Sequence, residues 1–224
     1  IEPNVGTITV PDERMNELAK LINPQRIVPT TIEIVDIAGL VKGASKGEGL
    51  GNMFLANIRE TDAILHVLRC FDDDNIIHVD GSVNPIRDKE IIDTELQLKD
   101  LDSIDKKLQR ISRAAKTGDK DAAKAEATLL KYKNHLESGQ SARNCEVTED
   151  EAKFVEDIYL LTAKPVLYVC NVDEASVVNG NKYVDMVKEA AAKEGAGIIM
   201  ISAAIESDIA GLESYEDREA FLSD

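Results

Sequence analysis

Short β-branched runs alternate with segments of helical periodicity along most of the chain. The run from Thr31 to Ile37 is the clearest, and its apolar side chains predict a buried strand. Strands and helices in alternation predict an α/β fold with a mostly parallel sheet, in which ligands bind at the carboxyl ends of the strands. The expected strands are 5–10, 31–37, 63–71, 166–170 and 197–201, and the expected helices are 12–22, 53–62, 148–162, 181–193 and 205–224.

A narrow apolar seam replaces this alternation after Pro85. Apolar side chains recur at alternating three- and four-residue spacing over 101–115, and the same spacing returns over 122–136 after a turn at Gly118. This spacing predicts two helices packed as an antiparallel hairpin. We therefore expect one domain with an insertion: an α/β domain made of 1–84 and 160–224, and a helical coiled-coil insertion at 85–159.

The role of the hairpin stays open between a structural arm and a docking arm. A cluster of basic residues on one face would favour docking, and the first helix offers Lys106, Lys107, Arg110 and Arg113. The net charge of −16 argues against bulk electrostatic binding to nucleic acid or to anionic membranes, but it leaves room for a local basic patch.

Composition indicates the expected solubility and cellular compartment of the protein. Hydrophobic residues make up 43% of the chain without an apolar run of membrane-spanning length, which predicts a soluble protein. The three cysteines lack C-x-x-C spacing, which favours a reducing cytoplasm over a disulfide frame or a zinc site. The histidines are too dispersed to suggest a metal cluster. These residues are Cys70, Cys145, Cys170, His66, His78 and His135.

A carboxylate and a glycine follow the predicted strand 31–37 in the pattern D-x-x-G. Asp36 can hold the water shell of a Mg²⁺ ion, and Gly39 lets a backbone N–H approach a terminal phosphate. The pattern is a signature of P-loop NTPases. By itself it is also typical of an ordinary turn after a strand, so the flanking residues decide between the two interpretations.

Several longer motifs carry a specific resemblance. The segment DIAGLVKGASKGEGLGN followed by FLANIRE resembles the switch II region of the Obg-like ATPases of the YchF type. The segments IEPNVG, RCFDDDNIIHV and NVDE are similar to the same family, and the likeness covers essentially the whole chain. It implies a Ras-like nucleotide-binding sheet in which strands 5–10 and 31–37 form an antiparallel edge. It also implies ATP as substrate, Mg²⁺ with K⁺ as a further candidate ion, and the ribosome as partner, with no membrane or direct DNA binding.

The resemblance assigns a base-binding role to residues after two strands. Asn171, Val172 and Glu174 occupy the place of the N-K-x-D motif of GTPases, and Ser202-Ala203-Ala204 would complete the pocket with backbone N–H groups. Guanine offers two donors to the short aspartate of that motif, whereas adenine presents an acceptor at N1 and has no amine at C2. Glu174 in its place favours adenine, and Val172 could only pack on the ring. The alternative is a helix-entry turn without a ligand.

His78 is the expected catalytic residue. Leu40 stands where Ras-type proteins carry the glutamine that orients the attacking water, and leucine cannot hydrogen-bond to water. The resemblance gives this role to His78, whose imidazole can position or accept from water near neutral pH. A loop histidine bonded to local backbone is the competing interpretation. His66 lies inside a predicted strand and is expected to be structural.

The P-loop motif G-x-x-x-x-G-K-[ST] does not occur in these 224 residues. The family carries it upstream and carries a TGS domain downstream, so we expect a truncated piece whose parent hydrolyses ATP. The piece itself is expected to be inactive and to bind ATP weakly or not at all. Two further hypotheses remain: a non-catalytic interaction module that uses the hairpin, and a GTPase with a divergent base motif.

Overall fold

Three parallel strands form the sheet that holds the candidate site. They are β3 (Ile64–Arg69), β4 (Val166–Asn171) and β5 (Gly197–Ile201), in the order β3-β4-β5. The protein is described by a computed structural model that covers residues 4–37, 50–76, 78 and 81–212. The chain divides at residue 40 into two compact units, each described by itself below.

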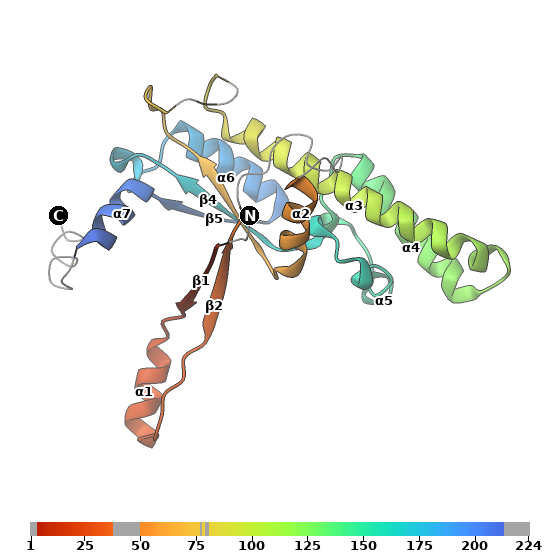
Figure 1. Cartoon of the computed structure of the whole chain (residues 1–224), viewed down its shortest axis with the longest axis horizontal. Helices are drawn as coiled ribbons and strands as arrows, with labels where there is room; N and C mark the ends of the chain where they lie inside the picture. Colours follow the sequence, from red (N-terminus) through yellow and green to blue (C-terminus); the bar gives the residue numbers. More distant parts are fainter. Residues whose placement is uncertain (1–3, 38–49, 77, 79–80, 213–224) are drawn as a thin grey trace. The chain divides into compact units, whose positions relative to one another are not determined.

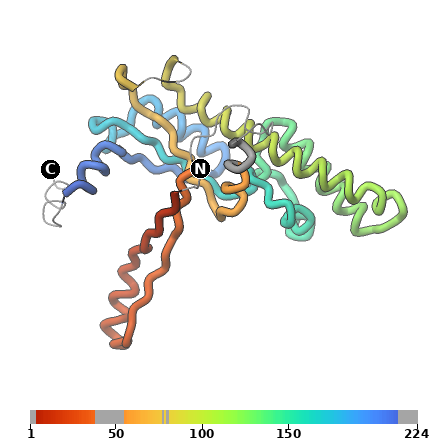
Figure 2. Tube along the Cα trace, viewed as in Figure 1, coloured from red at the N-terminus to blue at the C-terminus, as the bar shows by residue number. Residues whose placement is uncertain are grey.

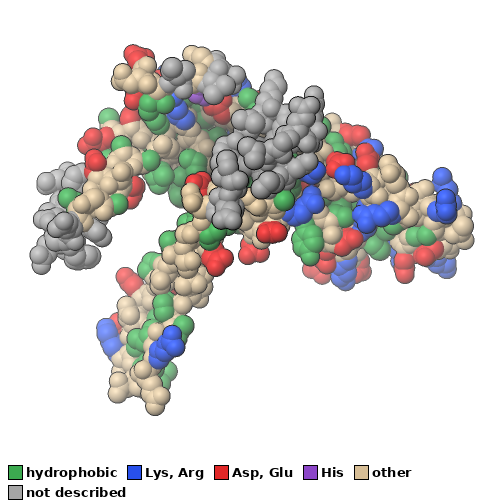
Figure 3. All heavy atoms as spheres, viewed as in Figure 1, with side chains coloured by type: hydrophobic (Ala, Val, Ile, Leu, Met, Phe, Trp, Pro, Cys, Tyr) green, Lys and Arg blue, Asp and Glu red, His purple; other side chains and the backbone are tan. Residues whose placement is uncertain are grey.

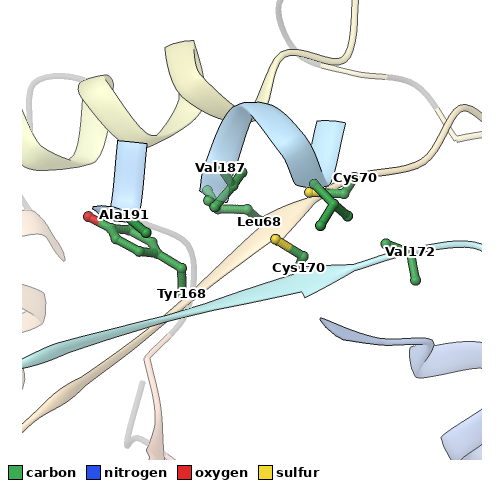
Figure 4. Packing of buried hydrophobic residues seen from close by; sticks show 8 residues of the cluster. Leu68, Cys70, Tyr168, Cys170, Val172, Val187 and Ala191 are labelled. Carbon is green, nitrogen blue, oxygen red and sulfur yellow. The ribbon is translucent and has the colours of Figure 1, made fainter. Parts of the chain in front are cut away.

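One face of this sheet is buried under helix α6 (Lys182–Glu194) and the start of helix α3 (Pro85–Lys116). Alternate side chains of β3 and β4 point to this face, as the period of two in a strand requires. Asn181 begins α6 by accepting hydrogen bonds from Tyr183 N and Val184 N, and Gly195 ends it at φ 65°. The core residues, most of them labelled in Figure 4, are Leu68, Cys70, Tyr168, Cys170, Val172, Val184, Val187 and Ala191.

The predicted helical hairpin is confirmed. Helix α3 begins at Pro85, with Asn84 as its N-cap, and α4 (Lys120–Glu137) returns beside it (Figures 1 and 2). Ile104 of α3 and Leu129 of α4 are fully buried in the seam. The hairpin therefore has a hydrophobic core of its own, to which the segment after α4 also contributes.

The expected helix over 148–162 is wrong as a continuous helix. The structure has a short helix α5 (Glu149–Ala152), which Thr148 starts with a capping box, and then two 3-10 turns, η3 (Glu156–Ile158) and η4 (Leu161–Ala163). Buried Asp100 of α3 takes the backbone N–H groups of Leu161 and Thr162, at 2.7 and 2.8 Å. Those donors are therefore lost to any continuing helix.

The remaining elements of this larger unit connect the sheet to its surroundings. Helix α2 (Leu50–Glu60) precedes β3, and its Leu55 and Ile58 are buried. Helix α7 (Ala203–Gly211) follows β5. Two further 3-10 turns are η2 (Ala142–Asn144) and η5 (Glu174–Ser176). None of the helices in the described residues is long and apolar enough to cross a membrane.

The smaller unit is a strand–helix–strand segment. Strands β1 (Asn4–Thr9) and β2 (Thr31–Asp36) pair antiparallel, as the resemblance implies, with Asn4 opposite Asp36. Helix α1 (Glu13–Ile22) lies between them in sequence and is capped by Asp12. The expected strand is present, and within this unit Ile32 and Ile34 are 50% and 40% exposed. Its expected burial stays a prediction.

Candidate functional site

The carboxyl ends of β4 and β5 are joined by the two motifs expected to bind a base. The Asn171 side-chain oxygen accepts a hydrogen bond from Ala203 N, at 3.0 Å. Val172 N donates to Ile201 O, at 2.8 Å, which extends the ladder between the two strands by one bond. Residues 32 positions apart in sequence therefore form one edge of the sheet.

The three residues that follow Asn171 have different surroundings. Val172 is 3% exposed and packs in the core against α6, so its side chain faces away from solvent. Asp173 accepts from Ser176 N, at 2.8 Å, and thereby caps the turn η5. Glu174 is exposed, which leaves its carboxylate accessible to a ligand.

Ser202 carries a buried hydroxyl for which the described part of the chain provides no hydrogen-bond partner. The residue is 2% exposed and stands at the N-cap of α7, yet its side chain makes no capping bond. Leaving a buried polar group unpaired costs about 1–3 kcal/mol, which is unusual enough to need a reason. Ala203 and Ala204, the next two residues, are exposed at the start of the helix.

The loop after β3 reaches the same edge of the sheet. Cys70 N donates to Asn171 O, at 2.8 Å, and the Asn181 side chain donates to Cys70 O, at 2.7 Å. A shallow cavity of about 280 Å³ opens here. It is lined by Phe71, Asp72, Asp173, Ser176, Asn181, Lys182 and Tyr183.

Arg69 holds this acidic loop in shape. Its guanidinium donates to the carbonyl oxygens of Phe71, Asp73 and Ile76, at 3.1, 3.2 and 2.9 Å. Five donors in a rigid fork allow one arginine to fix three backbone groups of a short loop. The sequence interpretation did not single out Arg69, although it opens the RCFDDDNIIHV motif.

His78, the expected catalytic residue, is held against the first turn of α3. Its Nε2 lies 3.0 Å from a carboxylate oxygen of Asp88, and its Nδ1 lies 3.5 Å from Nη2 of Arg87. A carboxylate only accepts and a guanidinium only donates, so the proton of the ring belongs on Nε2 and the lone pair on Nδ1. Both of these partners are side chains of α3.

The remaining candidates are placed as follows. Asp36 is exposed at the carboxyl end of β2, so its carboxylate is accessible to the water shell of a magnesium ion. Gly39 and Leu40 lie outside the described residues. His66 lies in β3 beside Tyr168, with ring centroids 5.6 Å apart, and burial lowers its pKa. This placement is that of a structural residue.

A buried ionic cluster under the sheet was not foreseen. Lys89 of α3 is 6% exposed and forms ion pairs with Asp93, at 2.6 Å, and with Glu194 of α6. The Tyr168 hydroxyl donates to Glu194, at 2.8 Å. Burial disfavours the charge on Lys89, but the two carboxylates outweigh it and raise its pKa. The cluster fixes the base of the hairpin to the sheet.

Comparison with known proteins agrees with this architecture. A family model described as 50S ribosome-binding GTPase matches residues 4–113. A solved structure of the Schizosaccharomyces pombe YchF GTPase superposes on 98% of the chain with a TM-score of 0.82 and 37% identity, and the match covers 60% of that protein. The chain therefore has the fold of the P-loop GTPase class.

Curated relatives point to one family within this class of protein. The proteins named ribosome-binding ATPase YchF of Escherichia coli O157:H7 and Bacillus subtilis are each 50% identical to this chain over its full length. The chain spans 61% and 62% of their lengths. The resemblance drawn from the motifs is confirmed: the chain is homologous over its full length to the proteins named ribosome-binding ATPase YchF.

Proposed function

We propose that this chain supplies the base-binding and water-positioning parts of an ATP-hydrolysing switch protein that acts at the ribosome. The observation that carries the proposal is the joined edge of the sheet: Asn171 is bonded to Ala203, and the orphaned hydroxyl of Ser202 lies next in sequence to it. A nucleotide base at this edge would give Ser202 a partner. The ribosome is part of the proposal because the relatives are named ribosome-binding ATPases. Association with ribosomes would place the protein in the cytoplasm.

Each residue of the site has a proposed contact with the nucleotide or a supporting role. Glu174 reads the base, with Asn171 shaping its loop and the backbone of Ser202, Ala203 and Ala204 closing the pocket. Val172 supports the pocket from the core. Asp36 holds Mg²⁺ through water, and Gly39 approaches the terminal phosphate. When bound, Mg²⁺ neutralises charge on the phosphates, and K⁺ is a second ion to test.

His78 is the proposed catalytic residue. In the contacts described above, the lone pair of Nδ1 faces Arg87, and Asp88 fixes the ring from the other side. If the Arg87 side chain moved away, Nδ1 would become accessible to water while Asp88 still held Nε2. Asp88 is therefore proposed as a positioning residue for His78.

The proposed domains keep the boundaries predicted from sequence. Residues 1–84 and 160–224 form the nucleotide-binding domain, and 85–159 form the helical insertion. The start of α3 at Pro85 supports the first boundary. Asp100, which anchors Leu161 and Thr162, supports the second, because the returning chain meets the hairpin there.

The test joins these residues to the P-loop segment that the family carries upstream, and this P-loop fusion is assayed for Mg²⁺-dependent ATP hydrolysis in K⁺ and in Na⁺. We expect turnover of ATP and weaker competition by GTP. A fusion that binds neither nucleotide would contradict the proposal. A fusion that binds GTP as well as ATP would support the alternative of a GTPase with a divergent base motif.

A further inference from the structure

An open cavity of about 530 Å³ lies between helix α3 and the chain that follows α5 (Figure 1). Its volume falls within the range of about 300–1,000 Å³ that is typical of ligand pockets. All of its lining residues belong to the proposed helical insertion, and none of them belongs to the candidate functional site. The residues that line this insertion cavity are Lys107, Lys153, Phe154, Glu156, Asp157 and Tyr159.

Two aromatic side chains in the segment after α5 line the cavity, whereas their aliphatic neighbours do not. Val155, Ile158 and Leu160 pack in the hydrophobic core of the hairpin. Phe154 and Tyr159 line the insertion cavity, and Tyr159 is 63% exposed. The aliphatic side chains therefore account for the packing of this segment, and the two rings are available to a ligand.

The backbone of Tyr159 gives a separate reason to assign a role to its ring. The residue has φ 47° and ψ 62°, the left-handed conformation, which is unfavourable for a residue with a Cβ. Asn23 is the other non-glycine residue of the described part with positive φ, and asparagine tolerates this conformation better. Glycine would let the chain turn at this point without strain. The turn therefore does not explain a tyrosine at this position.

Both cations at the insertion cavity are already paired with carboxylates. Lys107 forms an ion pair with Asp157, and Lys153 forms one with Asp150, at 2.8 Å. Glu156, by contrast, is exposed and forms no ion pair with any cation in the described part of the chain. The charge that is left for a ligand at this cavity is therefore negative.

The surroundings of the cavity are also acidic. Residues 146–157 contain six Asp or Glu and one Lys, a charge of −5. Ion pairs from Lys107 and Lys131 of the hairpin offset two of these five charges. In Figure 3, red acidic side chains lie among blue basic ones over the hairpin. Charge complementarity therefore favours a cationic ligand.

We infer that the insertion cavity binds an arginine side chain presented by a basic polypeptide segment. A guanidinium is planar and is attracted to the negative face of an aromatic ring, so Phe154 and Tyr159 suit it. The carboxylate of Glu156 can accept hydrogen bonds from its N–H groups. The inference goes beyond the proposed function, because it gives the insertion a protein partner and does not involve the nucleotide.

Other classes of ligand fit the insertion cavity less well. A phosphate group would need a free cation, but Lys107 and Lys153 are both engaged by carboxylates. An apolar peptide would cover the carboxylate of Glu156 without offering it a partner, which is unfavourable. A lysine side chain supplies the charge but lacks the flat surface that stacks on a ring.

Fluorescence anisotropy of short labelled peptides with the whole chain tests the inference. The probe is a peptide that alternates arginine with glycine, and two matched peptides carry lysine or citrulline in place of arginine. Citrulline keeps the shape of the arginine side chain but has no charge. We expect the arginine peptide to bind at least about tenfold more tightly than the citrulline peptide. It should also bind more tightly than the lysine peptide.

Substitutions at Tyr159 locate the binding at the cavity. Tyr159→Gly removes the ring and suits the left-handed backbone, so the fold should be kept while affinity falls by about threefold to thirtyfold. Tyr159→Asn, which also suits this backbone, should show the same loss and serves if the glycine variant is unstable. Tyr159→Phe keeps a ring and should keep the affinity. Circular dichroism checks that each variant is folded.

A matched pair of substitutions separates the carboxylate of the cavity from the net charge of the protein. Glu156→Gln should weaken binding of the arginine peptide by about twofold to fivefold. Glu189→Gln makes the same change of charge at an exposed position of α6 and should leave the affinity unaltered.

Several outcomes would overturn the inference. An unaltered chain that binds none of the peptides, or binds the arginine and citrulline peptides equally, would contradict a site for a guanidinium. Tighter binding of the lysine peptide would contradict stacking on the rings. Unaltered affinity in Tyr159→Gly would place the contact outside the cavity, and equal losses in Glu156→Gln and Glu189→Gln would reduce the effect to net charge. None of these measurements involves a nucleotide, so the proposed function is tested separately.

Discussion

The carboxyl ends of β4 and β3 lie at one edge of the sheet but are held by hydrogen bonds to different parts of the protein. After β4, hydrogen bonds to the end of the neighbouring strand β5 carry the structure: Val172 N is bonded to Ile201 O, and the Asn171 side chain to Ala203 N. After β3, side chains carry it: Arg69 shapes the loop and Asp88 holds His78. The first arrangement belongs to the sheet. The second depends on the hairpin, because Asp88 is part of α3.

This difference separates two tasks. The end of β4 is proposed to choose the nucleotide, and the end of β3 to promote hydrolysis. Asp88 belongs to α3 whereas the ladder between β4 and β5 does not, so we propose that a displacement of the hairpin would reach His78 before it reached that ladder. Hydrolysis would then respond to a partner while the choice of nucleotide stays fixed.

The largest expected effect is on the end of β3. In the P-loop fusion, His78→Ala should lower kcat by about 10²–10⁴-fold, because a positioned acid or base contributes that much. KM for ATP should change little, since the imidazole need not touch the bound substrate. His135→Gln, a change in the hairpin, is the control. Steady-state kinetics that show an unaltered kcat for His78→Ala would return His78 to a structural role.

Lys89 tests whether the hairpin is anchored through the buried cluster. Lys89→Met removes the cation from the partly buried carboxylates of Asp93 and Glu194, which should cost up to about 3–5 kcal/mol in the free energy of unfolding. Lys106→Met breaks an exposed pair with Asp102 and should cost less than about 1 kcal/mol. Urea unfolding followed by circular dichroism measures both. Similar losses for the two variants would contradict a special role of the cluster.

Asp88 sharpens the comparison through a double-mutant cycle. Asp88→Ala should lower kcat by about tenfold in the P-loop fusion, and Asp88→Asn, which keeps an acceptor for Nε2, should restore part of it. In the His78→Ala background the same changes should have no further effect. If Asp88→Ala lowers kcat equally with and without His78, its role is structural. If His78→Ala has no effect at all, it is the catalytic proposal that fails.

The smallest expected effect concerns His66, which lies on the buried part of β3. Burial lowers its pKa below the ordinary value of 6.5 in the folded state, so the unfolded chain takes up the proton first as the pH falls. Stability from this residue is present above about pH 6.5 and is lost as the pH falls toward the lowered pKa. His66→Phe keeps the ring beside Tyr168 and cannot titrate.

Unfolding free energies at about pH 7.5 and about pH 5 measure this contribution. The difference between the two should be smaller in His66→Phe than in the unaltered chain. An identical difference in both proteins would assign the acid sensitivity to other groups.

Much of the fold was predictable because local patterns agree with it. The seam of the hairpin, the cap at Asn181 and the strands at β4 and β5 appear where periodicity and capping residues place them. The break in 148–162 was not predictable, because Asp100 reaches it from 61 residues away.

The candidate site was predictable where a motif is continuous in sequence. The segments around Asn171 and Ser202 could be found as motifs, and their contact follows from neighbouring parallel strands. The partners of His78 could not be found in this way, since a histidine pattern does not reveal a hydrogen-bond partner ten residues away. One signal was available: Asn84-Pro85 marks a helix start, which places Asp88 in the first turn, close to the loop that carries His78.

One measurement tests the separation of tasks most directly: kcat and KM for ATP and for GTP in the P-loop fusion, with Glu174→Asp and His78→Ala compared side by side. Glu174→Asp should shift the ratio of the two KM values toward GTP by about tenfold, one well-placed polar contact, and leave kcat nearly unaltered. His78→Ala should lower kcat equally for both nucleotides and leave the ratio of KM values as it was. If Glu174→Asp leaves that ratio unaltered, or if His78→Ala shifts it, the two strand ends do not divide the work as proposed.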